Sequence, residues 1–151
     1  MKKKLIILIT TVCYAGYFPC ASGTFTSLLA AIICYLTWRH PLTYLTILIL
    51  SGVIGFMFSG QAEEIFQKKD ASYIVIDEFC GMFIAFLFIK LNLAILVIGF
   101  LLFRILDIVK PLNIRKLEKL ASSWGIMLDD ISAGVLTNVI LQLGIVFYRV
   151  F

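Results

Sequence analysis

Residues 103–111 read F-R-I-L-D-I-V-K-P, and residues 125–134 read G-I-M-L-D-D-I-S-A-G. These polar blocks interrupt strongly apolar runs, and a block of the same construction, D-A-S-Y-I-V-I-D-E-F-C-G, occupies residues 70–81. Ionisable groups inside or at the edge of a membrane span are costly and mark functional sites by default. We therefore expect the apolar segments to form a scaffold that brings the polar blocks together.

The composition is that of an integral membrane protein. Of the 151 residues, 62% are hydrophobic and 15% are charged, too few charges to cover a soluble domain of this length. No linker rich in proline, glycine, serine or charge divides the chain, so we predict one membrane-embedded domain over residues 1–151. The four cysteines lie in apolar runs without metal-ligand spacing, and we interpret them as buried apolar residues.

Apolar runs and their breaks predict an all-α protein, a compact bundle of about five transmembrane helices with short interfacial helices. The expected spans are 24–38, 42–58, 73–89, 93–106 and 131–151. A short interfacial helix is expected at 60–70. Residues 112–120 form a basic amphipathic segment, which either contacts an anionic membrane surface or is an ordinary solvated helix.

The N-terminus resembles a signal peptide, because three lysines precede an apolar run. Bulky residues occupy the place where a cleavage site needs small ones, so we expect this segment to be retained. The distribution of cations then orients the bundle. Placing the N-terminus and the 59–78 and 103–130 loops in the cytoplasm puts ten of the thirteen cations there. In this layout the N-terminal segment lies on or dips into the membrane without crossing it.

Five carboxylates should converge near the cytoplasmic boundary: Asp77, Glu78, Asp107, Asp129 and Asp130. Anions held together in partly desolvated space repel, so protons or a cation must relieve them. Oxygen ligands without histidine or cysteine favour a hard ion, and Mg²⁺ is the leading candidate because it is commonly held by carboxylates together with a substrate phosphate. Arg104 and Lys110 flank Asp107 at helical spacing and predict an anion clamp on the same surface.

Small and hydroxyl residues accompany these acids. Asp77 with Gly81 and Asp130 with Gly134 both form D-x-x-x-G, which places a glycine one turn from the carboxylate and permits close helix approach. Residues 22–27, S-G-T-F-T-S, begin the first expected span. The hydroxyls there, on Thr24 and Ser27 among others, either bind phosphate at a helix N-terminus or only cap the helix.

Together these motifs resemble the phosphatidylglycerophosphatase A family of small bacterial membrane phosphatases. The family pattern contains P-G-T-x-G-S, D-P-x-x-I-V-x-D-E-x-x-G, F-R-x-x-D-x-x-K-P and G-x-M-x-D-D-x-x-A-G. This chain keeps the last two intact and in order. Ser22 and Thr26 depart from the first motif, and Ala71 departs from the second.

The resemblance implies a phosphoric monoester hydrolase that uses Mg²⁺ to convert phosphatidylglycerophosphate to phosphatidylglycerol and inorganic phosphate. It implies a bacterial inner-membrane location with the active site facing the cytoplasm, and membrane lipids rather than nucleic acid as partners. The expected metal-binding and catalytic residues, as direct ligands or as groups that position the attacking water, are Asp77, Glu78, Asp107, Asp129 and Asp130. The expected phosphate-binding residues are Arg104, Lys110, Thr24 and Ser27.

Other classes fit parts of the pattern. A small multi-pass cation transporter or channel would need acids through the depth of the membrane, whereas these acids cluster at one side beside arginine and lysine. A non-catalytic lipid-binding subunit would keep the basic surface without needing so many acids. Signatures of other phosphatases, such as D-x-D-x-T or a cysteine six residues before an arginine, are absent. A covalent aspartyl phosphate and direct attack by water both stay open.

Overall fold

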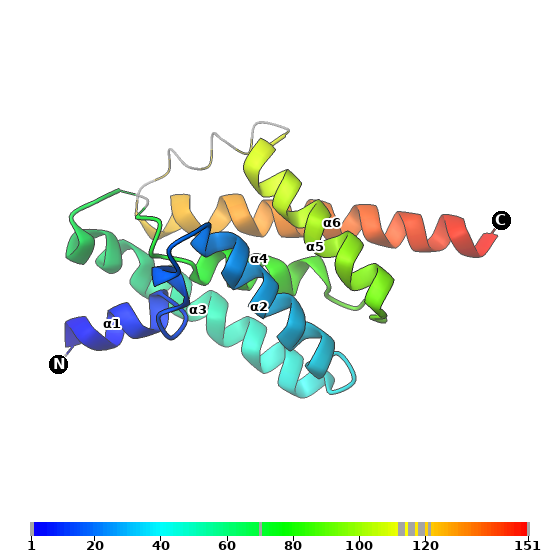
Figure 1. The fold of residues 1–151 in the computed structure, drawn as a ribbon, viewed down its shortest axis with the longest axis horizontal. Helices are drawn as coiled ribbons and strands as arrows, with labels where there is room; N and C mark the ends of the chain where they lie inside the picture. The colour runs from blue at the N-terminus through cyan, green and yellow to red at the C-terminus, as the bar shows by residue number, and fades with distance from the viewer. Residues whose placement is uncertain are drawn as a thin grey trace.

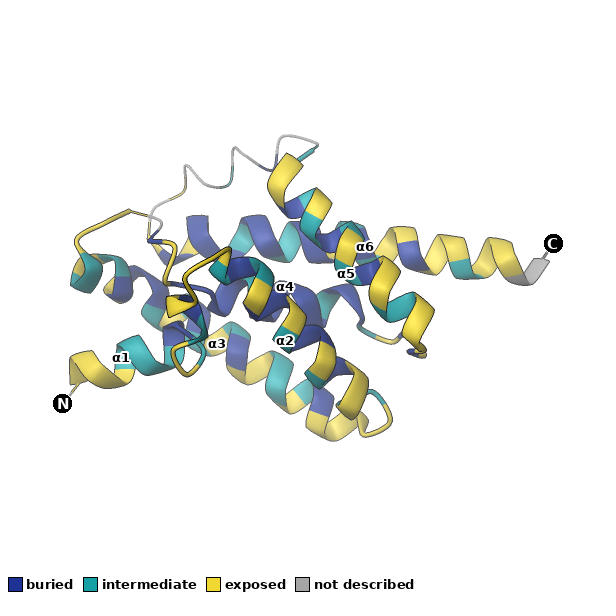
Figure 2. Cartoon of the chain, viewed as in Figure 1, coloured by how far each residue is buried: buried dark blue, intermediate teal, exposed yellow. Residues whose placement is uncertain are grey.

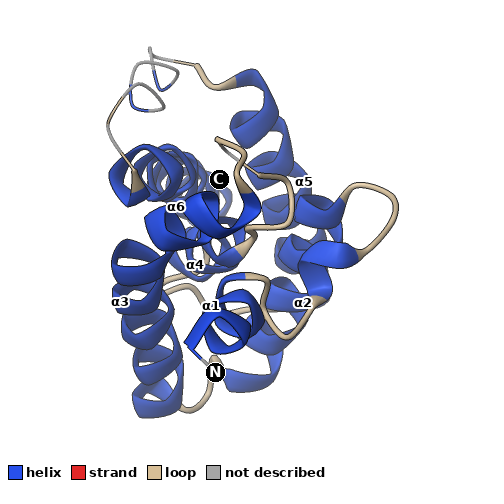
Figure 3. Cartoon of the chain, turned by 90° about the vertical axis from the view of Figure 1, so that its left-hand side faces the viewer, coloured by secondary structure: helices blue, strands red, loops and turns tan. Residues whose placement is uncertain are grey.

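The computed structural model describes residues 2–69, 71–111, 114, 117, 120 and 122–150, with residues 149 and 150 described by their backbone only. Within them the chain is all-helical, with no strand (Figures 1 and 3). The elements in order are α1 (Lys2–Thr10), the 3₁₀ turn η1 (Ala15–Tyr17), α2 (Ser22–Thr37), α3 (Pro41–Phe66), α4 (Ile76–Ala85), α5 (Leu93–Val109) and α6 (Ser123–Val150). The predicted all-α class is confirmed.

Helix α4 lies at the centre of the bundle, packed against α2, α3 and α6 (Figure 2). Eight of its ten residues are buried, and the side chains of Met82 and Phe83 are fully so. Its first turn contains Asp77 and Glu78, where the exposed N–H dipoles of a helix start favour negative charge. The most buried helix therefore carries two of the predicted site residues.

In the described part of the chain, two helices are long and apolar enough to cross a membrane, namely α3 and residues Ser123–Tyr148 of α6. Each has 26 residues, or about 39 Å of helix, against about 30 Å of hydrocarbon in a bilayer. Only 22% of the apolar window of each is buried. Large apolar side chains such as Leu42 (83% exposed) and Phe88 (85% exposed) lie on the surface. So much outward-facing apolar surface identifies a membrane protein.

The expectation of five full helical spans is not met by the described residues. Helices α2 and α5 match two expected spans but have 16 and 17 residues. Helix α5 ends at Val109, and the next residue, Lys110, has a left-handed backbone (φ 48°) and precedes Pro111. The interfacial helix expected at 60–70 is also wrong, because α3 continues unbroken to Phe66. Helix α6 begins at Ser123, eight residues before the expected start, so the acidic block at 125–134 lies within this helix.

The third expected span, 73–89, is helical only over Ile76–Ala85. After α4 ends, the chain continues through irregular backbone to Leu91, with Phe86, Ile89 and Leu91 buried. Backbone at membrane depth must find hydrogen bonds inside the protein. The Asn138 Nδ2 on α6 donates to the Ala85 and Leu87 carbonyls at 3.1 and 2.9 Å. The Tyr44 hydroxyl on α3 donates to the Phe83 carbonyl at 2.5 Å. These two side chains replace the hydrogen bonds that a longer α4 would have made.

We expect Asn138→Leu to destabilise the bundle by about 1–3 kcal/mol, because two buried carbonyls lose their donor. Thermal or denaturant unfolding of the purified protein in detergent measures this. The matched control is Gln61→Leu, since Gln61 is exposed and its side chain donates only to its own helix, to the Met57 carbonyl. Equal stability of the two variants would contradict a structural role for Asn138.

The first helix is too short to cross a membrane by itself. Helix α1 has nine residues, or about 14 Å. It is tied to the loop before α4, because the Val75 N–H donates to the Thr10 carbonyl at 3.0 Å. That this segment is retained and that it does not cross the membrane both stay predictions. The basic amphipathic segment expected at 112–120 lies mostly outside the described residues.

Candidate active site

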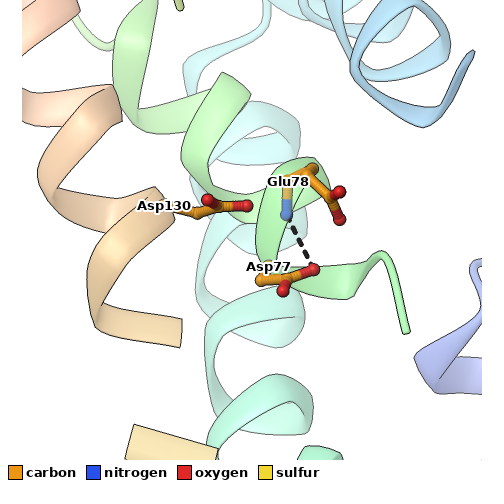
Figure 4. A group of neighbouring side chains, drawn as sticks. All are labelled: Asp77, Glu78 and Asp130. Carbon is orange, nitrogen blue, oxygen red and sulfur yellow. Dashed lines mark hydrogen bonds between the residues drawn. The ribbon is translucent and has the colours of Figure 1, made fainter. Parts of the chain in front are cut away.

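Three carboxylates from two helices meet at the N-terminal end of α4. Asp130 projects from α6 toward Asp77 and Glu78 (Figure 4). One oxygen atom from each of the three lies within 4.8 Å of the others. Asp77 and Asp130 are only 7% and 4% exposed, and Asp77 Oδ1 accepts a hydrogen bond from the Glu78 N–H at 3.0 Å. Charges this close in a desolvated place repel strongly unless a cation joins them.

Two glycines allow α4 and α6 to approach closely enough to form this triad. A Cβ atom on Gly81 would lie 2.7 Å from the Asp130 carbonyl oxygen and 3.0 Å from the Phe103 ring. A Cβ atom on Gly134 would collide with the Gly81 carbonyl oxygen. Each D-x-x-x-G glycine therefore packs against the other motif, and the predicted close helix approach is confirmed.

Asp107 and Asp129 lie beside the triad, but each is paired with a cation. Arg104 Nη1 is 2.6 Å from Asp107 Oδ2, and Lys110 Nζ is 2.5 Å from Asp129 Oδ2. Asp107 is also close enough to the triad for their charges to interact. The structure thus brings all five predicted carboxylates and both predicted cations to one place. It separates them into three acids that form no ion pair among the described residues and two acid–base pairs.

The N-terminus of α2 forms another wall of the site. Ser27 Oγ donates to the Gly23 carbonyl at 2.8 Å and accepts a 3.4 Å hydrogen bond from Arg104 Nη1. A Cβ atom on Gly23 would collide with Glu78 Oε1 and lie 3.5 Å from Arg104 Nη1. Thr24 is half-buried, and its hydroxyl makes no hydrogen bond within the described part of the chain. Of the two predicted hydroxyl residues, Ser27 is therefore the one that contacts a predicted phosphate-binding cation.

Gly23 is a site residue that sequence reasoning did not single out. Its signal was present, as a glycine among hydroxyl residues at a helix start. Its function in packing depends on where α2 meets α4, and nothing in the local sequence specifies that contact. A side chain at this position would push Glu78 away from the triad.

Several buried polar atoms of the site lack a hydrogen-bond partner among the described residues: Glu78 Oε2, Arg104 Nε and Asp129 Oδ1. Buried polar groups are nearly always partnered, so unpaired carboxylate oxygens indicate a place for a cation and the unpaired guanidinium N–H a place for an anion. The triad offers only oxygen donors, as a hard divalent ion requires. The residues present therefore fit a divalent metal beside a phosphate group.

Fold and site together define a helical membrane protein with an acidic, metal-competent site next to cations suited to phosphate. The chain belongs to the phosphatidylglycerophosphatase A family, whose sequence profile matches residues 8–145. All four motifs quoted above lie inside the matched range. Membership makes the protein a lipid phosphatase, a phosphoric monoester hydrolase of phospholipid metabolism, rather than a cation transporter.

Three relatives are similar over most of the chain. A Bacteroides thetaiotaomicron protein named "Putative phosphatidylinositol-3-phosphatase" is 37% identical over 145 residues, covering 91% of each chain. Escherichia coli Phosphatidylglycerophosphatase A is 35% identical over 130 residues, 84% of this chain and 76% of the relative. The Haemophilus influenzae protein of the same name is 33% identical over 125 residues, 80% of this chain and 77% of the relative. No solved structure matches the chain.

Proposed function

We propose that the protein removes the terminal phosphate from phosphatidylglycerophosphate, giving phosphatidylglycerol and inorganic phosphate. Two relatives named for this activity support the substrate. The observation that carries the proposal is the acid triad of Asp77, Glu78 and Asp130 beside Arg104, within one buried site. A phosphomonoester dianion needs both a metal-binding group and a fixed cation for its charge to be stabilised in the transition state.

The proposed metal is Mg²⁺, and the triad residues Asp77, Glu78 and Asp130 would hold it. Their oxygen-only donor set and the unpaired Glu78 Oε2 support this assignment. When bound, the ion supplies Lewis-acid chemistry, neutralising phosphate charge and activating water.

Arg104 and Lys110 are the proposed phosphate-binding residues. Each already makes a charged hydrogen bond, to Asp107 and to Asp129 respectively, so we propose that these two acids position the cations rather than bind the metal. Arg104 Nε has no partner within the part of the chain that the structure describes, and it is available to a phosphoryl oxygen.

Hydroxyl and carboxylate atoms near the cations complete the proposed machinery. Ser27 holds Arg104 from the α2 side. The Thr24 hydroxyl is a proposed hydrogen-bond donor to the phosphate, since it has no partner of its own among the described residues. Asp129 Oδ1 also has no partner in the described segments and would accept a hydrogen bond from the attacking water.

A second candidate substrate is a phosphomonoester on an inositol head group. The Bacteroides thetaiotaomicron relative, named "Putative phosphatidylinositol-3-phosphatase", favours it. Both candidates carry a phosphomonoester on the head group of a diacyl lipid, so the same metal and cation arrangement would serve either. The two differ in the bulk and hydroxyl pattern of the alcohol that leaves.

Phosphate release from defined lipids tests the proposed function. Purified protein in mixed micelles should hydrolyse phosphatidylglycerophosphate with Mg²⁺, lose activity with EDTA and regain it when Mg²⁺ is restored. Phosphatidylinositol 3-phosphate, phosphatidic acid and lysophosphatidic acid are the comparison lipids. Faster release from any of these would overturn the proposed substrate, and full activity after chelation would overturn the metal.

We also propose that the whole chain is one domain with five membrane segments in the bacterial inner membrane. The segments are α2, α3, α4 with its irregular continuation, α5 and α6. The hydrogen bonds from Asn138 to the Ala85 and Leu87 carbonyls support this arrangement, because irregular backbone inside a membrane needs partners from the protein. The excess of cations at the end of the bundle that holds the acids supports a cytoplasmic active site.

Cysteine labelling tests this orientation. In a background without the four native cysteines, Lys69→Cys should react with an impermeant maleimide only from the cytoplasmic side, and Lys90→Cys only from the other side. Both positions are exposed in the structure. Labelling of the two positions from the same side would contradict the arrangement.

A further inference from the structure

The end of the bundle opposite the active site has its own polar group. Lys90 is exposed in the irregular stretch before α5, and Asn92 caps that helix by accepting the Ile95 N–H at 2.8 Å. From Asn92 to Asp107, α5 rises about 22 Å. Lys90 is therefore remote from the active site and lies toward the other membrane surface.

A groove of about 750 Å³ opens between α5 and α6 at this end. Its volume is in the range of small-molecule sites, roughly 300–1,000 Å³. Most of the lining is apolar and reaches inward to Leu102 and Leu141. Lys90, Asn92 and Tyr148 are the lining residues nearest the bundle end. The groove thus joins a polar mouth to an apolar channel directed into the membrane.

A second hollow of about 250 Å³ also has Lys90 in its wall. Trp38, Tyr44, Leu45 and Phe86 are among its other lining residues. One exposed cation therefore lines two apolar hollows. A diacyl phospholipid is complementary to this surface, because it has one anionic phosphodiester group and two apolar acyl chains.

This end of the bundle carries cations without balancing acids. The Arg39 guanidinium lies 5.1 Å over the Trp38 ring, and Lys90 forms no ion pair among the described residues. No aspartate or glutamate occurs in residues 1–62, 79–106 or 131–151. The resulting potential attracts anions to this surface, whereas the carboxylates are concentrated at the other end.

We propose that Lys90 and the two hollows bind one anionic diacyl phospholipid from the leaflet opposite the active site. The lipid phosphate would pair with Lys90, and its acyl chains would occupy the two hollows. A zwitterionic lipid carries its own cation and gains less from Lys90. The inference rests on α3 and α6 crossing the membrane and is independent of the proposed reaction.

Tryptophan fluorescence tests this site, because Trp38 lines the smaller hollow. The chain has two tryptophans, so Trp124→Phe leaves Trp38 as the single reporter. Protein in phosphatidylcholine micelles is titrated with brominated phosphatidylserine or brominated phosphatidylcholine, neither of which is a phosphomonoester. We expect phosphatidylserine to quench Trp38 at about fivefold lower mole fraction, the preference that one interfacial lysine provides. Lys90→Gln should remove the preference.

Two further variants make the test specific. Lys68→Gln removes an exposed cation at the active-site end and should keep the preference. Gly144→Phe should weaken quenching by phosphatidylserine without disturbing the fold, because a Cβ on Gly144 meets no atom within 4 Å in the larger groove. An unchanged preference in Lys90→Gln would overturn the proposal, as would competition by soluble glycerol 3-phosphate. If a second copy of the chain covered the larger groove instead, Gly144→Phe would change the oligomeric state and leave the quenching unchanged. That result would also overturn the proposal.

Discussion

Replacing Asp130 with asparagine should lower phosphate release about a thousandfold, because a bound metal contributes several kcal/mol of charge stabilisation. The same change should raise the thermal stability of the metal-free protein. It removes one of three carboxylates whose oxygens lie within 4.8 Å of one another, and with it a like-charge repulsion. Stabilisation of the protein by added Mg²⁺ should be lost, since the ligand set is broken. Steady-state hydrolysis and thermal unfolding with and without Mg²⁺ measure all three effects.

Asp129→Asn provides the contrast that separates the triad from the ion pairs. It removes the carboxylate that pairs with Lys110, so stability should fall rather than rise. Activity should fall about 10–100-fold, the cost of losing a group that orients others. Glu64→Gln, a change to an exposed acid on α3, should leave both quantities unchanged. Near-normal turnover in Asp130→Asn would remove this residue from the site, and identical stability changes in the two variants would contradict the division of the acids.

Gly81→Ala should strongly reduce activity even though it adds one methyl group. Its Cβ would lie 2.7 Å from the Asp130 carbonyl oxygen, closer than such contacts allow, so α4 and α6 must separate. We expect a loss of about 1–3 kcal/mol in stability from this overpacking. Activity should fall about a hundredfold, since displacing catalytic groups by an ångström has an effect of this size. Unfolding in detergent and phosphate release, both with saturating Mg²⁺, measure the two effects.

Gly144→Ala is the matched control, because it makes the same change in a helix where the new Cβ meets nothing within 4 Å. Alanine is favoured over glycine inside a helix by about 1 kcal/mol, so this variant should be as stable as the parent or more so. Its activity should be unchanged, since Gly144 is remote from the triad. A Gly81→Ala protein that behaved like Gly144→Ala would show that the close approach of α4 and α6 does not maintain the site.

The site residues could be predicted because charged side chains are energetically unfavourable in a membrane-embedded chain unless they have a function. In a chain that is 62% hydrophobic, an acid such as Asp107 or Asp130 stands out without any knowledge of the fold. Their spacing relative to Arg104 and Lys110, and the glycines one turn away, indicated helix faces and close packing. The all-α class followed from the same apolar runs, since helices satisfy their own backbone hydrogen bonds in lipid.

Helix boundaries were less predictable because tertiary contacts set them. Apolar residues continue past Ala85, yet α4 ends there, and Asn138 and Tyr44 bind the carbonyls of the terminal region. An apolar sequence indicates that a segment is buried or contacts lipid. It does not distinguish a helix from irregular backbone whose carbonyls are hydrogen-bonded by side chains of other helices. The polar residues at 60–66 likewise indicated a separate interfacial helix, whereas α3 continues through them without a break.

The sequence by itself determined that this is a helical membrane protein, which acids and cations carry its chemistry, and which family its motifs match. Those properties are local, because they depend on residue type and spacing along the chain. Only the tertiary structure decided that Asp77, Glu78 and Asp130 form one group while Asp129 of α6 pairs with Lys110 at the end of α5. It also decided that Gly23 lies against Glu78. These pairings depend on how four helices pack, and identical carboxylates acquire different partners from that packing alone.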